Sequence, residues 1–149
     1  MTDKAKGNLL VIIQFALIAA IVLMAIDEVN EPWIYIGGVL FIAPGLITIY
    51  FGIKQLGGSL TVHPEPKSGA QLVETGLYKF VRHPIYTGLL LATFGSVVQS
   101  MAVVKFFVWV ILLLVLNYKA RWEEKLLAKK YSTYTDYMKR TGRFVPRLK

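Results

Sequence analysis

The distribution of apolar residues along the chain predicts helices long enough to cross a membrane. Residues 9–26 contain one polar side chain, Gln14, and residues 33–53 contain no charge. Residues 85–117 contain a single charge, Lys105. One helix over that third stretch would be about 50 Å long, against a hydrocarbon core of about 30 Å. We therefore expect a break near Gln99 and Ser100. The pattern predicts four membrane helices, at 9–26, 33–53, 85–99 and 102–118.

Composition agrees with this pattern. The chain has 149 residues, of which 55% are hydrophobic and 17% are charged, and a soluble domain of this length is rarely so apolar. We expect an all-α integral membrane protein with a single domain over residues 1–149. The chain lacks cysteine, which excludes a disulfide framework, a thiolate metal site and a cysteine nucleophile. His63 and His83 are the only histidines, so no metal site is predicted.

The net charge of +8 predicts the orientation in the membrane. Of seventeen Lys and Arg residues, all except Lys105 fall before the first predicted helix, in the loop 54–84 or in the tail 119–149. The positive-inside rule places this loop, the tail and both termini in the cytoplasm. The expected location is a bacterial or archaeal plasma membrane. Nucleic acid is not an expected partner, because lipid headgroups explain bases and aromatics at a membrane face more simply. The oligomeric state is left open, since Gly37, Gly38 and Gly45 allow close helix packing within or between chains.

The segment KFVRHPIY, residues 79–86, is the first candidate for chemistry. Pro84 suits the first turn of the third helix, because its missing N–H costs nothing there. Arg82 and His83 then lie beside free backbone donors at the positive end of the helix dipole. A bound anion would relieve this conflict of charge. The alternative is that Arg82 anchors the topology at lipid headgroups and that His83 is an interfacial residue without a role.

The tail contains the second candidate, the pair Glu123 and Glu124, on a continuation of the fourth helix past Leu127. Adjacent helical residues project about 100° apart, so we expect at most one carboxylate to face a central site. The alternative is two solvated acids that pair with Lys119, Arg121 or Lys125. The three tyrosines at 131, 134 and 137 share one helical stripe, which is more typical of packing than of a ligand site. Gly142 and Pro146 are expected to end the helical part of the tail.

Together these segments resemble a known family. GLYKFVRHPIYTG, EEKLL and YTDYMKRTGRFVPR resemble the isoprenylcysteine carboxyl methyltransferases and their bacterial relatives, to which phospholipid N-methyltransferases are similar. The resemblance implies binding of S-adenosylmethionine at the cytoplasmic membrane face. It implies that Arg143 or Arg121 faces the methyl acceptor and that Glu123 or Glu124 closes the site. It further implies a cofactor site lined by His63, Ala70, Gln71, Leu72, Val73, Tyr78, Arg82, His83, Pro84 and Tyr86.

The expected reaction is methylation of a lipid-like or prenylated acceptor, with the carboxyl group of an isoprenylcysteine-type molecule first. A carboxylate acceptor needs only an arginine to position it. The alternative acceptor is a phospholipid amine, which must lose a proton and would use a glutamate such as Glu124, or His83, as base. The alternative of another class is a non-catalytic scaffold that binds lipid.

Overall fold

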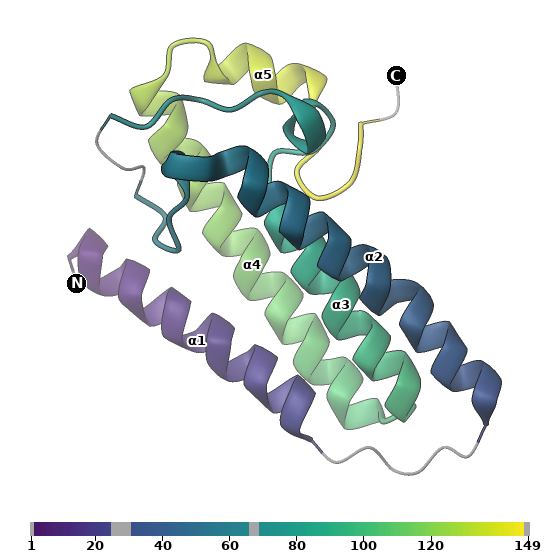
Figure 1. Ribbon diagram of the computed structural model, residues 1–149. Coiled ribbons are helices and arrows are strands. Elements are labelled where there is room, and N and C mark those ends of the chain that lie inside the picture. The colour runs from purple at the N-terminus through teal and green to yellow at the C-terminus, as the bar shows by residue number, and fades with distance from the viewer. Residues whose placement is uncertain (1, 25–30, 66–68, 148–149) are drawn as a thin grey trace.

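The computed structural model describes residues 2–24, 31–65 and 69–147. Within these ranges the protein is helical and forms no strand, which confirms the all-α prediction. Four long helices form a bundle, and α5 lies across one end of it (Figure 1). The elements are α1 (Asp3–Leu23), α2 (Pro32–Leu56), η1 (Gly57–Ser59), η2 (Gly76–Lys79), α3 (Pro84–Ser100), α4 (Val103–Lys130) and α5 (Tyr134–Arg140), where η marks a 3₁₀ helix.

Three segments are long and apolar enough to cross a membrane: α1, α2 with its 3₁₀ extension, and α4. α3 has 17 residues, about 26 Å of helix, and is slightly shorter than a typical hydrocarbon core. The predicted number of four spans is therefore approximate. The predicted break is confirmed, because α3 ends at Ser100 and Met101 takes a left-handed conformation with φ 49°. Residues 25–26, the predicted end of the first helix, lie outside the described residues.

α2 and α3 pack closely because glycines face each other across their contact. A Cβ atom added to Gly45 would lie 2.6 Å from the backbone nitrogen of Ala92 and 2.8 Å from the carbonyl oxygen of Gly88. One added to Gly38 would lie 2.7 Å from the carbonyl oxygen of Gly95. No side chain fits at these points, so the two backbones touch. Two of the glycines noted in the sequence thus pack within the chain.

Lys119 of α4 joins α1 to the loop that follows α2. Its side chain is buried, and Nζ donates to Gln14 Oε1 at 2.8 Å and to the carbonyl oxygen of Val62 at 2.8 Å. Gln14, the single polar residue in the apolar part of α1, is also buried. A polar group buried among apolar helices requires such partners. This pair therefore fixes α1 and the loop relative to α4.

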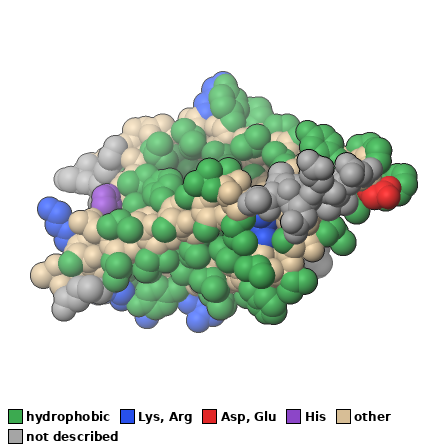
Figure 2. All heavy atoms as spheres, turned by 90° about the horizontal axis from the view of Figure 1, so that it is seen from below, with side chains coloured by type: hydrophobic (Ala, Val, Ile, Leu, Met, Phe, Trp, Pro, Cys, Tyr) green, Lys and Arg blue, Asp and Glu red, His purple; other side chains and the backbone are tan. Residues whose placement is uncertain are grey.

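The outer surface of the bundle is apolar. Figure 2 shows a face on which hydrophobic side chains predominate. Large apolar side chains are exposed on each of the three helices long enough to cross a membrane, α1, α2 and α4. They include Ile12, Leu40, Leu46, Phe107 and Leu114. A soluble protein rarely exposes so large an apolar area, whereas lipid tails solvate it without cost. The protein is accordingly an integral membrane protein.

The loop between α2 and α3, α5 and the final residues gather at one end of the bundle (Figure 1). A short extended segment of the tail runs alongside the residues that precede α3 and pairs with them through backbone hydrogen bonds. The amides of Arg82 and His83 donate to the carbonyl oxygens of Gly142 and Arg143 at 2.9 and 3.1 Å, and Gly142 N donates to Phe80 O at 3.1 Å. Thr87 Oγ1 donates to Phe144 O at 2.7 Å. This pairing holds residues 82–83 and the tail in one fixed unit.

Candidate functional site

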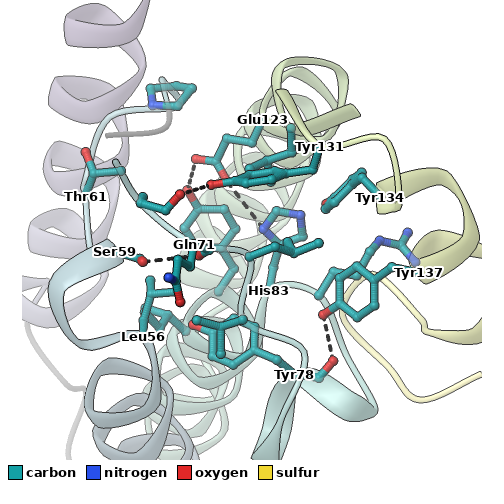
Figure 3. Close-up of a pocket in the computed structure, with 18 of the residues that line it drawn as sticks. Leu56, Ser59, Thr61, Gln71, Tyr78, His83, Glu123, Tyr131, Tyr134 and Tyr137 are labelled. Carbon is teal, nitrogen blue, oxygen red and sulfur yellow. Dashed lines mark hydrogen bonds and ion pairs between the residues drawn. The ribbon is translucent and has the colours of Figure 1, made fainter. Parts of the chain in front are cut away.

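A pocket opens at this end of the bundle, between the loop, α3, α4 and α5. Its empty volume is about 820 Å³, counting the space open to solvent at its mouth. Figure 3 shows His83 near the centre, with Glu123 and tyrosine rings around it. The lining residues are Leu56, Ser59, Thr61, His63, Pro64, Ala70, Gln71, Leu72, Val73, Tyr78, Arg82, His83, Ile85, Tyr86, Glu123, Leu127, Tyr131, Tyr134 and Tyr137.

His83 is placed by the start of α3. It is the N-cap residue, Pro84 opens the first turn as predicted, and the His83 ring stacks on Tyr86 with centroids 5.4 Å apart. Nδ1 lies 3.3 Å from Glu123 Oε2, and Nε2 lies 3.4 Å from Glu124 Oε1. The side chain is only 8% exposed, and Nε2 has no hydrogen-bond partner among the described residues. The nearest carboxylate to Nε2 is therefore Glu124, outside the pocket lining, whereas Nδ1 faces Glu123 of the pocket.

The expectation that at most one of the two glutamates faces the site agrees with the pocket lining, which includes Glu123 and not Glu124. His83 lies between the two carboxylates, so one imidazole contacts both even though they diverge around α4. Glu123 lines the pocket, and its Oε1 accepts a hydrogen bond of 2.5 Å from the Tyr86 hydroxyl. Glu124 points away from the pocket lining, toward the arginines. The alternative of two solvated acids is wrong, because both carboxylates are mostly buried.

Glu124 binds two arginines that are far apart in the sequence: Arg82, just before α3, and Arg143, in the tail. Arg82 Nε donates to Glu124 Oε1 at 2.8 Å, and Arg143 donates to both carboxylate oxygens at 3.1 and 2.7 Å. Arg82 also donates to the carbonyl oxygens of Met138 and Thr141, and Arg143 donates to Asn117 Oδ1 at 2.9 Å. The positive charge of Arg82 at the start of α3 is thus neutralised by the carboxylate of Glu124.

The charges of the cluster determine its protonation. Burial disfavours the charged imidazole, but the contacts with Glu123 and Glu124 outweigh burial, so the pKa of His83 is raised above its ordinary value. The hydrogen bonds from Glu124 raise the pKa of the Arg143 guanidinium. Burial raises the pKa of the Tyr78, Tyr134 and Tyr137 phenols, which therefore remain neutral. The described residues contain no group of three or more potential ligands suited to a metal ion.

Tyrosines form much of the pocket wall, which the sequence pattern did not reveal. Tyr131 is the residue that caps the C-terminus of α4, whereas Tyr134 and Tyr137 belong to α5, so the three do not form one helical stripe. The hydroxyl of Tyr137 donates to Tyr78 O at 2.6 Å, and that of Tyr131 donates to Ala70 O. Their spacing by three was visible in the sequence, but the turn after Lys130 that directs them to the pocket was not.

The structure brings most of the predicted site residues together and separates a few. His63, Ala70, Gln71, Leu72, Val73, Tyr78, Arg82, His83, Tyr86 and Glu123 line the pocket. Pro84 is buried in the first turn of α3 and does not line the pocket, and Glu124 and Arg143 form the neighbouring ion-pair cluster. Arg121 lies elsewhere, at a hollow on another side of α4. Sequence reasoning missed nine lining residues: Leu56, Ser59, Thr61, Pro64, Ile85, Leu127, Tyr131, Tyr134 and Tyr137.

A comparison with protein-family models gave a match to phospholipid methyltransferase over residues 33–134, more than half of the chain. The chain belongs to the phospholipid methyltransferase family. This family includes the isoprenylcysteine carboxyl methyltransferases, which confirms the resemblance seen in the sequence. The match contains His83, Glu123 and Glu124 but ends before Arg143. No curated protein matches the chain. Membership identifies a membrane methyltransferase of a family that acts on lipid.

Proposed function

We propose that the protein transfers a methyl group from S-adenosylmethionine, bound in the pocket around His83, to a polar group of a lipid. The observation that carries this proposal is the buried pocket in which His83 and Glu123 face apolar and aromatic walls at the end of a membrane bundle. When bound, the cofactor supplies an electrophilic methyl group on a sulfonium. The remaining requirements, which are binding, alignment and exclusion of water, fall to the residues of the chain.

The pocket residues fit the chemistry of this cofactor. The cofactor combines an adenine, a ribose diol, a carboxylate, an ammonium and a sulfonium. Glu123 offers a charged acceptor, and the imidazole of His83 lies beside it in the pocket wall. The neutral rings of Tyr78 and Tyr134 offer faces that favour adenine and cations. Leu56, Leu72 and Val73 supply the apolar surface. No group in this set opposes the cofactor.

The charged groups favour an amine as the methyl acceptor. Arg143, the predicted anchor for a carboxylate acceptor, already binds Glu124 with two hydrogen bonds. Glu123 remains as the pocket's carboxylate, and a carboxylate can take the proton that an amine must lose. The phospholipid amine therefore becomes the first candidate acceptor. The carboxyl group of an isoprenylcysteine-type lipid is the second, and it would require Arg143 to leave Glu124.

Calorimetry of S-adenosylmethionine binding to the detergent-purified protein tests the cofactor site. We expect His83→Ala and Glu123→Gln to weaken binding about tenfold or more, because each removes a charged pocket group. Lys129→Gln, an exposed change near the end of α4, is the control and should bind like the wild type. Thermal unfolding checks that each variant is folded. Absence of binding to folded wild-type protein would favour the alternative of a non-catalytic lipid-binding scaffold.

A second assay identifies the acceptor atom. The protein is incubated with labelled cofactor and bilayers that contain either phosphatidylethanolamine or a farnesylcysteine. An N-methyl product survives mild base, whereas a carboxyl methyl ester releases methanol. We expect base-stable label in the phosphatidylethanolamine bilayers. Label that is released by base from farnesylcysteine alone would reverse the order of the two acceptors.

A further inference from the structure

A second hollow lies outside the pocket, where α1, α4 and the tail meet. Its walls include Lys6 of α1, Tyr118, Arg121, Trp122 and Lys125 of α4, and residues of the tail. Four of its nine lining residues are basic and one, Glu124, is acidic. Glu124 is already bound by Arg82 and Arg143. The hollow therefore carries excess positive charge that belongs to neither the pocket nor the ion-pair cluster.

Three of the four basic side chains of this hollow, Lys6, Arg121 and Lys125, have no carboxylate partner among the described residues, whereas Arg143 pairs with Glu124. Arg121 and Lys125 are exposed, and neither makes a hydrogen bond or ion pair with any residue in the described ranges. They are four residues apart on one helix, where like charges repel. Lys6 Nζ lies over the rings of Tyr118 and Trp122, 5.1 and 4.7 Å from their centroids. An anion between these cations would remove the repulsion.

The same face of α4 changes from apolar to basic along its length. Five exposed residues follow one another along this face at spacings of three and four: Ile111, Leu114, Tyr118, Arg121 and Lys125. This spacing forms one stripe of the helix. Its sequence of aliphatic, aromatic and cationic side chains matches the order of acyl chain, interface and phosphate in a phospholipid. A soluble anion would use only the basic end of the stripe.

We propose that the phosphate of an anionic phospholipid binds in this hollow, between Lys6, Arg121 and Lys125, while an acyl chain follows Leu114 and Ile111. This lipid site lies apart from the methyl-transfer pocket, and the proposal does not depend on the proposed reaction. Trp122 and Tyr118 form the boundary between headgroup and chain. The site would hold the tail end of α4 at a defined depth in the bilayer.

Native mass spectrometry of the full-length protein in detergent tests the site, with added dioleoylphosphatidylglycerol as probe. We expect Arg121→Gln/Lys125→Gln to weaken lipid binding at least tenfold. Lys54→Gln/Lys129→Gln removes the same charge from α2 and from the end of α4, and should bind like the wild type. Dioleoylglycerol, which lacks the phosphate, should bind weakly to every variant. Both replaced side chains in the test variant are exposed, and unfolding temperatures verify the fold; Lys6→Gln provides a second variant.

Three results would overturn the proposal. Equal lipid binding by the wild type, Arg121→Gln/Lys125→Gln and Lys6→Gln would remove the hollow as the binding site. An equal loss in the Lys54→Gln/Lys129→Gln control would reduce the effect to net charge. Complete displacement of the lipid by inorganic phosphate at millimolar concentration would show a site for the free ion and not for a lipid.

Discussion

At the scale of single residues, Glu124 organises the charges behind the pocket. Its carboxylate is 7% exposed and contacts Arg82, Arg143 and the Nε2 side of His83. These partners come from the start of α3 and from the tail, so one side chain joins three segments. A buried ion pair gains little over apolar packing, but removing one partner leaves uncompensated charge.

Glu124→Gln is therefore expected to destabilise the folded protein by about 3 kcal/mol, because two arginines lose their counter-ion. Asp136→Asn is the control, since Asp136 pairs with Lys139 in an exposed position where solvent screens the charges. Chemical or thermal unfolding in a single detergent measures both. Equal changes in the two variants would mean that the buried cluster contributes no more than a surface pair.

His83 predicts a dependence of stability on pH. Its pKa in the folded state is raised above 6.5, so the folded state binds the proton more tightly than the unfolded state. The resulting stabilisation is complete below about pH 6.5 and is lost as the pH rises through the raised folded pKa. The difference in unfolding free energy between the wild type and His83→Gln should therefore shrink with increasing pH. A difference that grows with pH would contradict the assignment of a protonated imidazole between two carboxylates.

At the scale of elements, the contact between α2 and α3 determines where the pocket lies. Gly38 and Gly45 bring the two backbones together, and the end of α2 then holds the loop through Gln55, whose Oε1 accepts from Leu77 N at 2.7 Å. Tyr78 Oη donates to Gly52 O at 3.3 Å. The helix pair thus positions both the start of α3 and the loop that covers it.

Gly45→Ala is expected to destabilise the bundle by about 1–3 kcal/mol, because the added methyl group would overlap the backbone of α3. Gly37→Ala is a close control: it lies in the same helix, and the nearest atom to its added Cβ is Val98 Cγ1 at 3.7 Å. The unfolding temperature in detergent checks this. If Gly37→Ala lowered it as much as Gly45→Ala, loss of helix-to-helix contact would not be the cause.

At the scale of the whole molecule, the pocket, the tail and most of the basic residues share one end of the bundle, whereas Lys105 lies at the other. The site therefore lies at a membrane surface, where a lipid headgroup and a water-soluble cofactor can meet. The charge distribution predicts that this surface is cytoplasmic. The chain contains no cysteine, so single cysteines can report the orientation without background.

Gly58→Cys, at the pocket end, and Met101→Cys, in the turn between α3 and α4, form the matched pair. A membrane-impermeant maleimide should label Met101→Cys in intact cells and Gly58→Cys only after lysis. Met101 is 64% exposed, so the reagent can reach that position. The opposite labelling pattern would place the pocket outside the cytoplasm and overturn the predicted orientation.

The helices, the membrane class and the family follow from the sequence alone. Apolar runs, Pro84 and the break after Ser100 act over a few residues, and local backbone physics is sufficient to read them. About half of the pocket residues could also be predicted, because they lie in the polar loop between two apolar helices or near the polar end of the last one. The sequence could not supply the partners of these residues.

Tertiary structure alone decided those partners. Arg82 and Glu124 are 42 positions apart, and their contact depends on how α3, α4 and the tail pack. Helical periodicity predicted that at most one glutamate faces the site, and of the two Glu123 lines the pocket, but the sequence did not show that the His83 ring lies between both carboxylates. The turn after Lys130 directs the three tyrosines to the pocket, and Arg143 binds Glu124. Contacts between distant segments come from global packing, which local patterns in a single sequence do not encode.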